Sequence, residues 1–279
     1  MKHRMEYLLI ALMMLSFNSF AQKKEVLPLW DATTPYVNTG ESAKSKSLPT
    51  LTVYYANNPN GKAVISCPGG GYSSVSTQLE GHDMAEWFNG MGITYIVLDY
   101  RLPKGNYLVP LSDVEQAILT TRKNAGAWKI KPNKIGLMGA SAGGHLAATQ
   151  STLFKTRAAR PDFQILLYPV ITMNEKFTHK GSRDEFLGKN PSTELVNLYS
   201  CDKQVTRETP PAFITLSTDD TVVPAQNSIF YYLALLKKKV SVSLFAYPTG
   251  GHGWAYKDSF RYKKEWTSEL EKWLAEVIK

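Results

Sequence analysis

The sequence predicts an α/β fold in which helices cover both faces of a mostly parallel central sheet. Short apolar runs recur along the chain and alternate with stretches that carry apolar residues at helical spacing. Strands that are apolar throughout are typical of a parallel sheet buried on both faces. The chain has 279 residues, of which 43% are hydrophobic and 20% charged, a size and composition that suit one such domain.

The expected strands and helices follow one another regularly, separated by Pro, Gly and polar clusters. The expected strands are 62–67, 93–99, 134–138, 163–168, 212–218 and 242–247, with 51–55 as a further edge strand. The expected helices are 81–90, 110–126, 142–153, 223–236 and 260–278. The pattern lapses between Tyr168 and Pro211. We interpret 171–209 as a lid or substrate-side excursion, because long irregular segments in compact domains are often functional.

The first 21 residues predict a secretory signal peptide that is not part of the fold. Lys2 and Arg4 form a basic start, an uncharged apolar run covers 8–15, and small residues precede a cleavage site after Ala21. The apolar run is shorter than the roughly 20 residues that span a bilayer. We therefore expect a secreted or periplasmic protein in which 22–279 forms one domain, without a membrane partner.

Charge and cysteine content indicate neither a nucleic-acid partner nor a metal site. The formal net charge is +8, but the basic residues are spread along the chain, and the densest run is Lys237–Lys239 at an expected helix end. The two cysteines, Cys67 and Cys201, form no metal-binding pattern. Cys67 closes an apolar strand, which favours a buried free thiol over a disulfide in a chain of this size. No metal ion or cofactor is expected.

Ser141 is the candidate nucleophile. It lies in the motif G-A-S-A-G at 139–143, which fits the pattern G-x-S-x-G. The motif falls between an expected strand, 134–138, and an expected helix, 142–153, where such a turn lifts the serine hydroxyl above the edge of the sheet. Its glycines let strand and helix approach closely. A glycine-rich turn without chemistry is the alternative, which is disfavoured because suitable partners follow in order.

A serine hydroxyl needs a general base, and His252 is the best-placed histidine. It follows the last expected strand in a glycine-rich loop, whereas His145 lies one turn into the serine's helix, where packing or a hydrogen bond beside the site is expected. Asp219 and Asp220 follow the fifth expected strand, between the serine and the histidine in chain order. Either carboxylate could orient the imidazole. Of the remaining histidines, His3 lies in the expected signal peptide, and His82 and His179 precede any workable position in this order.

A glycine-rich loop at 68–72, with the sequence P-G-G-G-Y, is the candidate oxyanion hole. Its backbone N–H groups could approach a developing negative charge, and the N–H of Ala142, which follows the nucleophile, would add a further donor. A phosphate-binding loop is excluded, since no Lys-Ser or Lys-Thr follows Gly71 and G-x-G-x-x-G is not met. A flexible loop without function is the alternative.

Together these motifs resemble the α/β-hydrolase superfamily, and more narrowly the acetyl-xylan-esterase-like or BD-FAE-like carbohydrate esterases of bacteria that degrade polysaccharides. The resemblance runs through 67–72, 98–103, 139–146, 210–213, 220–224 and 250–254. It implies Asp220 rather than Asp219 as the acid, because in similar esterases the acid shortly precedes V-P or V-V-P. It also implies Gly70, Gly71 and Ala142 as oxyanion donors. The family's loop usually begins His-Gly-Gly, whereas Pro68 stands here in place of the histidine.

The implied activity is that of a serine esterase, with Ser141, His252 and Asp220 as the triad and an acylated carbohydrate or small ester as the substrate. Removal of acetyl groups from xylan-type oligosaccharides leads. A general carboxylesterase, an exopeptidase of the same fold and a non-catalytic carbohydrate-binding protein are the alternatives. No cluster with metal-ligand spacing supports a metal-dependent deacetylase. Three aromatic side chains could either stack on a sugar ring or pack in the core: Tyr72, Tyr168 and Trp254.

Overall fold

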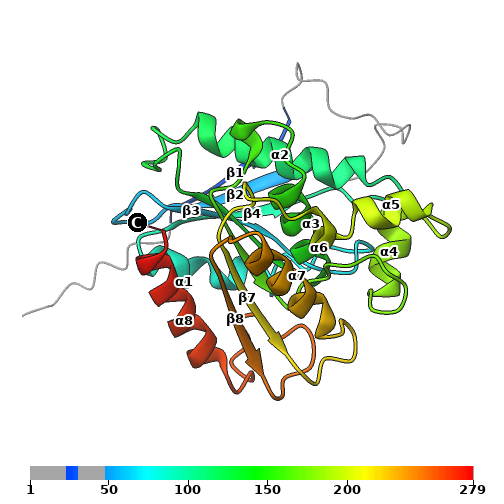
Figure 1. Ribbon diagram of the computed structural model, residues 1–279. Helices are drawn as coiled ribbons and strands as arrows, with labels where there is room; N and C mark the ends of the chain where they lie inside the picture. The colour runs from blue at the N-terminus through cyan, green and yellow to red at the C-terminus, as the bar shows by residue number, and fades with distance from the viewer. Residues whose placement is uncertain (1–22, 31–47, 279) are drawn as a thin grey trace, which may run out of the picture.

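An eight-stranded sheet forms the centre of the computed structural model, which describes residues 23–30 and 48–278 (Figure 1). The strand order is β1-β2-β4-β3-β5-β6-β7-β8; β2 runs antiparallel to both of its neighbours, and the other pairs are parallel. The strands are β1 Lys24–Pro28, β2 Thr50–Tyr54, β3 Ala63–Cys67, β4 Thr94–Asp99, β5 Ile135–Ala140, β6 Phe163–Leu167, β7 Ala212–Ser217 and β8 Val242–Tyr247. The prediction of a mostly parallel sheet is confirmed. The expected signal peptide, 1–21, lies outside the described residues.

Helices cover both faces of this sheet, as expected (Figure 1). On one face lie α2 Leu108–Lys123, α3 Ser141–Thr152 and α7 Gln226–Lys237, and on the other η1 His82–Met84, α1 Ala85–Gly90 and α8 Lys263–Glu276. Successive side chains of one strand enter opposite cores: Tyr95 packs with α1 and α8, whereas Ile96 packs with α2 and α3. Burial on both faces explains why the central strands are apolar at most positions.

The first two strands correct the expected edge of the sheet. The segment expected as an edge strand, 51–55, forms β2, but β1 covers its outer side through antiparallel pairing from Lys24 with Tyr54 to Pro28 with Thr50. The residues of β1 are mostly exposed and include two charges, so this strand carries no apolar signal. At the centre of the sheet, β5 continues two residues past its expected end at 138, to Ala140.

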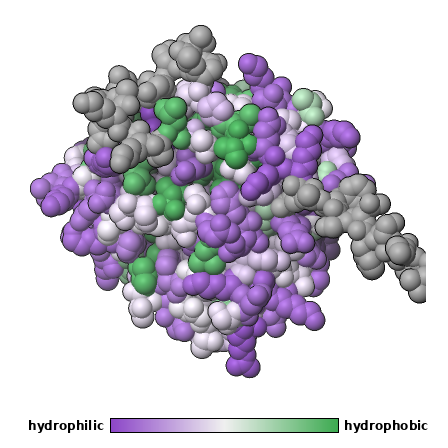
Figure 2. All heavy atoms as spheres, turned by 180° about the vertical axis from the view of Figure 1, so that it is seen from behind, coloured by the Kyte–Doolittle hydropathy of each residue, from purple (hydrophilic) through white to green (hydrophobic). Residues whose placement is uncertain are grey.

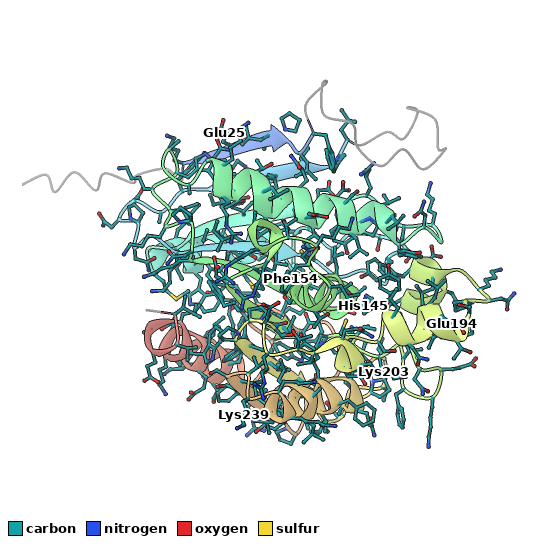
Figure 3. The ribbon with its side chains drawn as sticks, turned by 45° about the horizontal axis from the view of Figure 1, so that its top comes forward. Glu25, His145, Phe154, Glu194, Lys203 and Lys239 are labelled. Carbon is teal, nitrogen blue, oxygen red and sulfur yellow. The ribbon has the colours of Figure 1, made fainter. Side chains whose placement is uncertain are left out.

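Short helices occupy the segments where the sequence pattern is weak. One is the 3-10 helix η2 Arg157–Ala159, and the helices of the 171–209 segment are α4 Lys180–Leu187, α5 Thr193–Leu198 and α6 Cys201–Gln204. Figure 1 shows α4 and α5 on the side of the molecule away from α1 and α8. Glu194 and Lys203 are exposed on this segment (Figure 3). Helices of four to eight residues are too short to show a helical period in the sequence.

The surface and the cysteines agree with a well-filled interior. Figure 2 shows a mostly hydrophilic face on which apolar residues form separate small patches. Within 23–30 and 48–278, no helix is long and apolar enough to cross a membrane. Cys67 and Cys201 are both buried and free, which confirms the expected state of Cys67, and burial raises the pKa of the Cys201 thiol to about 12.

Candidate active site

Ser141 lies where β5 passes directly into α3, with no intervening loop. Its φ is +53°, a left-handed conformation that is uncommon for residues other than glycine. The helix can approach the sheet this closely because position 143 is a glycine: a Cβ on Gly143 would collide with the carbonyl oxygen of Cys67. The turn therefore has the strained strand-to-helix geometry that a nucleophile elbow requires.

A continuous chain of hydrogen bonds joins the three residues expected to form the triad. The Nε2 atom of His252 lies 2.8 Å from Oγ of Ser141, and its Nδ1 atom lies 2.6 Å from Oδ2 of Asp220. A carboxylate can only accept, so Nδ1 carries the proton and Nε2 accepts from the serine hydroxyl. The Asp220 side chain is 1% exposed and that of His252 16%, so the acid is buried and the imidazole is partly exposed.

The second oxygen of Asp220 is fixed by the backbone. Its Oδ1 atom accepts from the N–H groups of Val222 at 2.8 Å and Val223 at 2.9 Å. These two bonds hold the carboxylate so that Oδ2 faces the imidazole of His252. The V-V pair after the aspartate thus has a structural reason: its N–H groups cap the same carboxylate.

The neighbouring carboxylate, Asp219, contacts a different group. It accepts from the backbone N–H groups of Gly250 at 3.2 Å and Gly251 at 2.8 Å, in the segment 248–255, which we call the histidine loop. Sequence motifs alone did not decide between the two aspartates. The structure brings Asp220 to the imidazole and Asp219 to the backbone of the loop that carries the imidazole.

The glycine loop, residues 68–74, lies against the serine, since a Cβ on Gly69 would be 3.0 Å from Cβ of Ser141. Gly70 and Gly71 have φ values of +122° and +65°, which favour glycine. The carbonyl of Gly70 accepts from the N–H of Ser74 at 3.1 Å. Among the described residues, no hydrogen bond uses the N–H of Gly70, Gly71 or Ala142, so the three expected oxyanion donors are available.

The three aromatic residues considered for substrate contact lie in the core, which corrects that expectation. Tyr72 is 0%, Tyr168 1% and Trp254 3% exposed. Trp254 stacks on Phe260 with ring centroids 4.1 Å apart. With so little of these side chains exposed, the structure supports the alternative interpretation, core packing, for all three.

His145 confirms the expected role of a hydrogen-bonded core histidine. Its Nδ1 atom lies 2.9 Å from the hydroxyl of Tyr72, and its Nε2 atom lies 2.8 Å from the carbonyl oxygen of Tyr199. It is buried beside the elbow, inside the molecule (Figure 3). Burial lowers the pKa of this imidazole to about 4, so the residue is neutral at neutral pH.

Two residues that lie near the site, His179 and Glu80, were not predicted from the sequence to be there. His179, dismissed for its place in chain order, caps α4, and its Cε1 atom would lie 3.6 Å from a Cβ on Gly71. Burial, and next the neighbouring His252, lower the pKa of His179. Glu80 is 5% exposed, and its Oε2 atom accepts from the N–H of Gly69 at 2.8 Å. Neither residue belongs to a recognisable motif. Within the described ranges, no group of three or more His, Cys, Asp or Glu residues could hold a metal ion.

Comparison with known proteins yields both a family and named relatives. A family described as the alpha/beta hydrolase fold matches residues 64–256. The chain is 41% identical over 231 residues to an acetylxylan esterase of Xylanibacter ruminicola, and the match covers 81% of this chain and 48% of that protein. It is 34% identical over 221 residues to an endo-1,4-beta-xylanase B of Butyrivibrio fibrisolvens, covering 74% of this chain and 34% of that one.

A solved structure agrees with these sequence matches. The acetyl ester-xyloside bifunctional hydrolase of Caldicellulosiruptor lactoaceticus superposes with a TM-score of 0.82 and 33% identity, over 93% of this chain and 98% of that one. The chain spans about half or less of the length of the two curated relatives named above. The family match covers more than half of the sequence and contains the strand–turn–helix around Ser141, the glycine loop and the histidine loop. This chain belongs to the alpha/beta hydrolase fold family.

Proposed function

We propose that the protein is a serine esterase that removes acetyl groups from xylan-type oligosaccharides. The observation that carries the proposal is the hydrogen-bonded chain from Ser141 through His252 to Asp220, beside a glycine loop with unused N–H groups. The acetyl group and the xylan-type alcohol are suggested by relatives, which are named an acetylxylan esterase and an acetyl ester-xyloside hydrolase.

The proposed reaction is a two-step acyl transfer. Ser141 Oγ attacks the ester carbonyl while His252 Nε2 takes its proton, and Asp220 stabilises the imidazolium that results. The negative charge on the carbonyl oxygen is stabilised by N–H groups of Gly70 or Gly71 and of Ala142. The imidazolium then protonates the departing sugar oxygen. Water, deprotonated by the same histidine, attacks the acetyl-serine and releases acetate.

Two features make this charge distribution favourable. Ala142 is in the first turn of α3, where the N–H groups of a helix end favour negative charge. The Asp220 carboxylate is buried beside the imidazole and already holds two backbone hydrogen bonds, so it needs no rearrangement when His252 becomes charged.

The test is acetate release from acetylated xylo-oligosaccharides, measured beside hydrolysis of p-nitrophenyl acetate. The proposal expects a higher kcat/KM on the oligosaccharides and a loss of at least about 10³-fold in both reactions for Ser141→Ala. A general carboxylesterase would hydrolyse the small ester at least as efficiently as the sugar. Full activity of Ser141→Ala would contradict the proposed nucleophile.

We also propose that the chain is exported and cleaved after Ala21. The support is the basic start at Lys2 and Arg4 followed by the uncharged apolar run. The intact mass of protein recovered from the periplasm or medium should correspond to a chain that begins at Gln22. A mass that includes the first 21 residues would contradict the proposed cleavage.

A further inference from the structure

We propose that Glu80 is a positioning residue for the reaction, which ties the glycine loop and the histidine loop to one buried carboxylate. The inference rests on the proposed esterase function and assigns a role to a residue outside the triad and the oxyanion donors. Glu80 lies between β3 and α1, far in sequence from both Ser141 and His252. Each of its side-chain oxygens contacts a different part of the site.

The first oxygen holds the glycine loop. Oε2 of Glu80 accepts from the backbone N–H of Gly69 at 2.8 Å, and the carbonyl of Gly69 accepts from the N–H of Ser76 at 2.9 Å. Both backbone polar groups of Gly69 are therefore fixed immediately before Gly70 and Gly71, the proposed donors. Pro68 has no side-chain donor or acceptor, and its carbonyl oxygen accepts from the hydroxyl of Tyr100 at 2.6 Å. The Glu80 carboxylate anchors the next residue, which directly precedes the proposed donors.

The second oxygen holds the histidine loop through a tyrosine. Oε1 of Glu80 accepts from the hydroxyl of Tyr168 at 2.8 Å, and that hydroxyl accepts in turn from the N–H of Ala255 at 3.1 Å. The Tyr168 ring lies edge-on to the ring of His252, with centroids 4.8 Å apart and an interplanar angle of 65°. The carboxylate thus fixes both the ring beside the imidazole and the backbone three residues after it.

Tyr168 and Ala255, which the tyrosine hydroxyl joins, both have an uncommon backbone conformation. Tyr168 has a φ of +37° and Ala255 a φ of +35°, although neither is a glycine. Such conformations persist where surrounding contacts enforce them, and they gather at functional sites. Here the enforcing contacts include the Tyr168 hydroxyl, which Glu80 orients.

Burial makes this network hard to replace with water. Glu80 is 5% and Tyr168 1% exposed. Burial, and then the charge of Glu80 and its hydrogen bond, raise the pKa of Tyr168 well above its ordinary value, so its hydroxyl remains a donor. The backbone of Glu80 is fixed as well, because its carbonyl accepts from the hydroxyl of Ser66 at 3.0 Å.

Glu80→Gln is the informative change. An amide keeps the shape and one acceptor oxygen, but its NH2 group would face either the N–H of Gly69 or the hydroxyl of Tyr168. Either the N–H of Gly69 or the hydroxyl of Tyr168 therefore loses its acceptor. Because the change acts on the placement of the oxyanion donors and the imidazole, we expect kcat to fall about 10- to 100-fold while KM changes less than about threefold. Glu86→Gln, at an exposed position of α1, is the matched control and should behave as wild type.

Tyr168→Phe provides a second route, which also serves if Glu80→Gln does not fold. It removes the hydroxyl that links Glu80 to Ala255 and keeps the ring beside His252, and we expect a kcat loss in the same range. If the residues act as one unit, the double variant should lose clearly less than the product of the single losses. Circular dichroism and melting temperature should show that the compared variants are folded.

Labelling of the serine by a fluorophosphonate separates this inference from the identity of the substrate. The probe needs the nucleophile, the base and the oxyanion donors, but no sugar. We expect about 10-fold slower labelling of Glu80→Gln or Tyr168→Phe than of wild type or Glu86→Gln. Wild-type rates of labelling and of turnover in folded Glu80→Gln, or in Tyr168→Phe, would overturn the role of Glu80. Absence of acetate release by the wild type would instead count against the proposed function alone.

Discussion

The glycine loop and the histidine loop are each held by a side-chain carboxylate, but only one of the two carboxylates is buried. Each loop follows the carboxyl end of a strand, β3 or β8, and each is held by a carboxylate that accepts from loop N–H groups. Glu80 holds the glycine loop from the interior, whereas Asp219 holds the histidine loop at an exposed position. Water can replace an exposed acceptor but not a buried one, so we expect the two anchors to differ in importance.

Gly70 of the glycine loop and Gly251 of the histidine loop differ in how closely they are surrounded. A Cβ on Gly70 would collide with the carbonyl oxygen of Ser74, and the φ of Gly70 is +122°. Gly251 has a φ of +60°, and a Cβ there would meet nothing within 4 Å. The backbone at Gly70 is therefore closely fitted, while the backbone at Gly251 has space around it. The orientation of the imidazole depends on a carboxylate of its own, through the bond between Nδ1 of His252 and Oδ2 of Asp220.

The largest expected effect tests that dependence. In Asp220→Asn, the Oδ1 position keeps the two backbone N–H bonds, so the NH2 group faces Nδ1 of His252 and favours the wrong tautomer. We expect kcat to fall about 10⁴-fold. Asp219→Asn keeps one acceptor for an exposed loop, and its loss should stay below about tenfold. Hydrolysis of p-nitrophenyl acetate measures both, and equal losses would remove the distinction between the two aspartates.

The next effect compares the two loops directly. Gly70→Ala cannot keep the backbone of the glycine loop, so an oxyanion donor should move and kcat should fall about 10²- to 10³-fold. Gly251→Ala meets open space in a conformation that costs an alanine roughly 1 kcal/mol, and kcat should stay within about threefold of wild type. The same ester assay, with melting temperatures, measures both variants. A Gly251→Ala loss as large as that of Gly70→Ala would contradict the difference in fit.

The smallest expected effect is on the stability of the fold. It concerns His145, whose imidazole lies within hydrogen-bond distance of Tyr72 in the glycine loop. The folded-state pKa of His145 is about 4, below the ordinary 6.5, so the unfolded chain binds a proton that the folded chain excludes. Its contribution is complete above about pH 6.5 and is lost as pH falls towards 4, by about 2 kcal/mol at pH 5. Urea unfolding at pH 7 and pH 5 measures it, with His145→Gln as control. An equal loss in the variant would assign the pH effect to other groups.

The site could be predicted where its chemistry depends on local order in the chain. Ser141 follows a strand and begins a helix, and His252 follows the last strand, so topology alone places both at one edge of the sheet. The choice of Asp220 needed the resemblance, because two adjacent aspartates follow β7 and only the fold shows which one turns towards the imidazole.

Features that depend on contacts distant in sequence could not be predicted. β1 is mostly exposed and gives no apolar signal, and it is held by pairing with β2. Trp254 follows His252 closely in sequence, and Tyr168 follows β6 at the same edge of the sheet. Whether these rings face substrate or core depends on contacts with Glu80 and Phe260. Glu80 itself belongs to no motif, and its role follows from reaching two loops at once.

The central claim is that Ser141 is the nucleophile activated by His252, and covalent labelling tests it most directly. Wild-type protein treated with a fluorophosphonate should carry one adduct, located by peptide mass spectrometry on the peptide that contains Ser141. Ser141→Ala should carry none, and His252→Ala should label at least about 10³-fold more slowly, since the base is lost. An adduct on another residue, or wild-type labelling of His252→Ala, would contradict the claim.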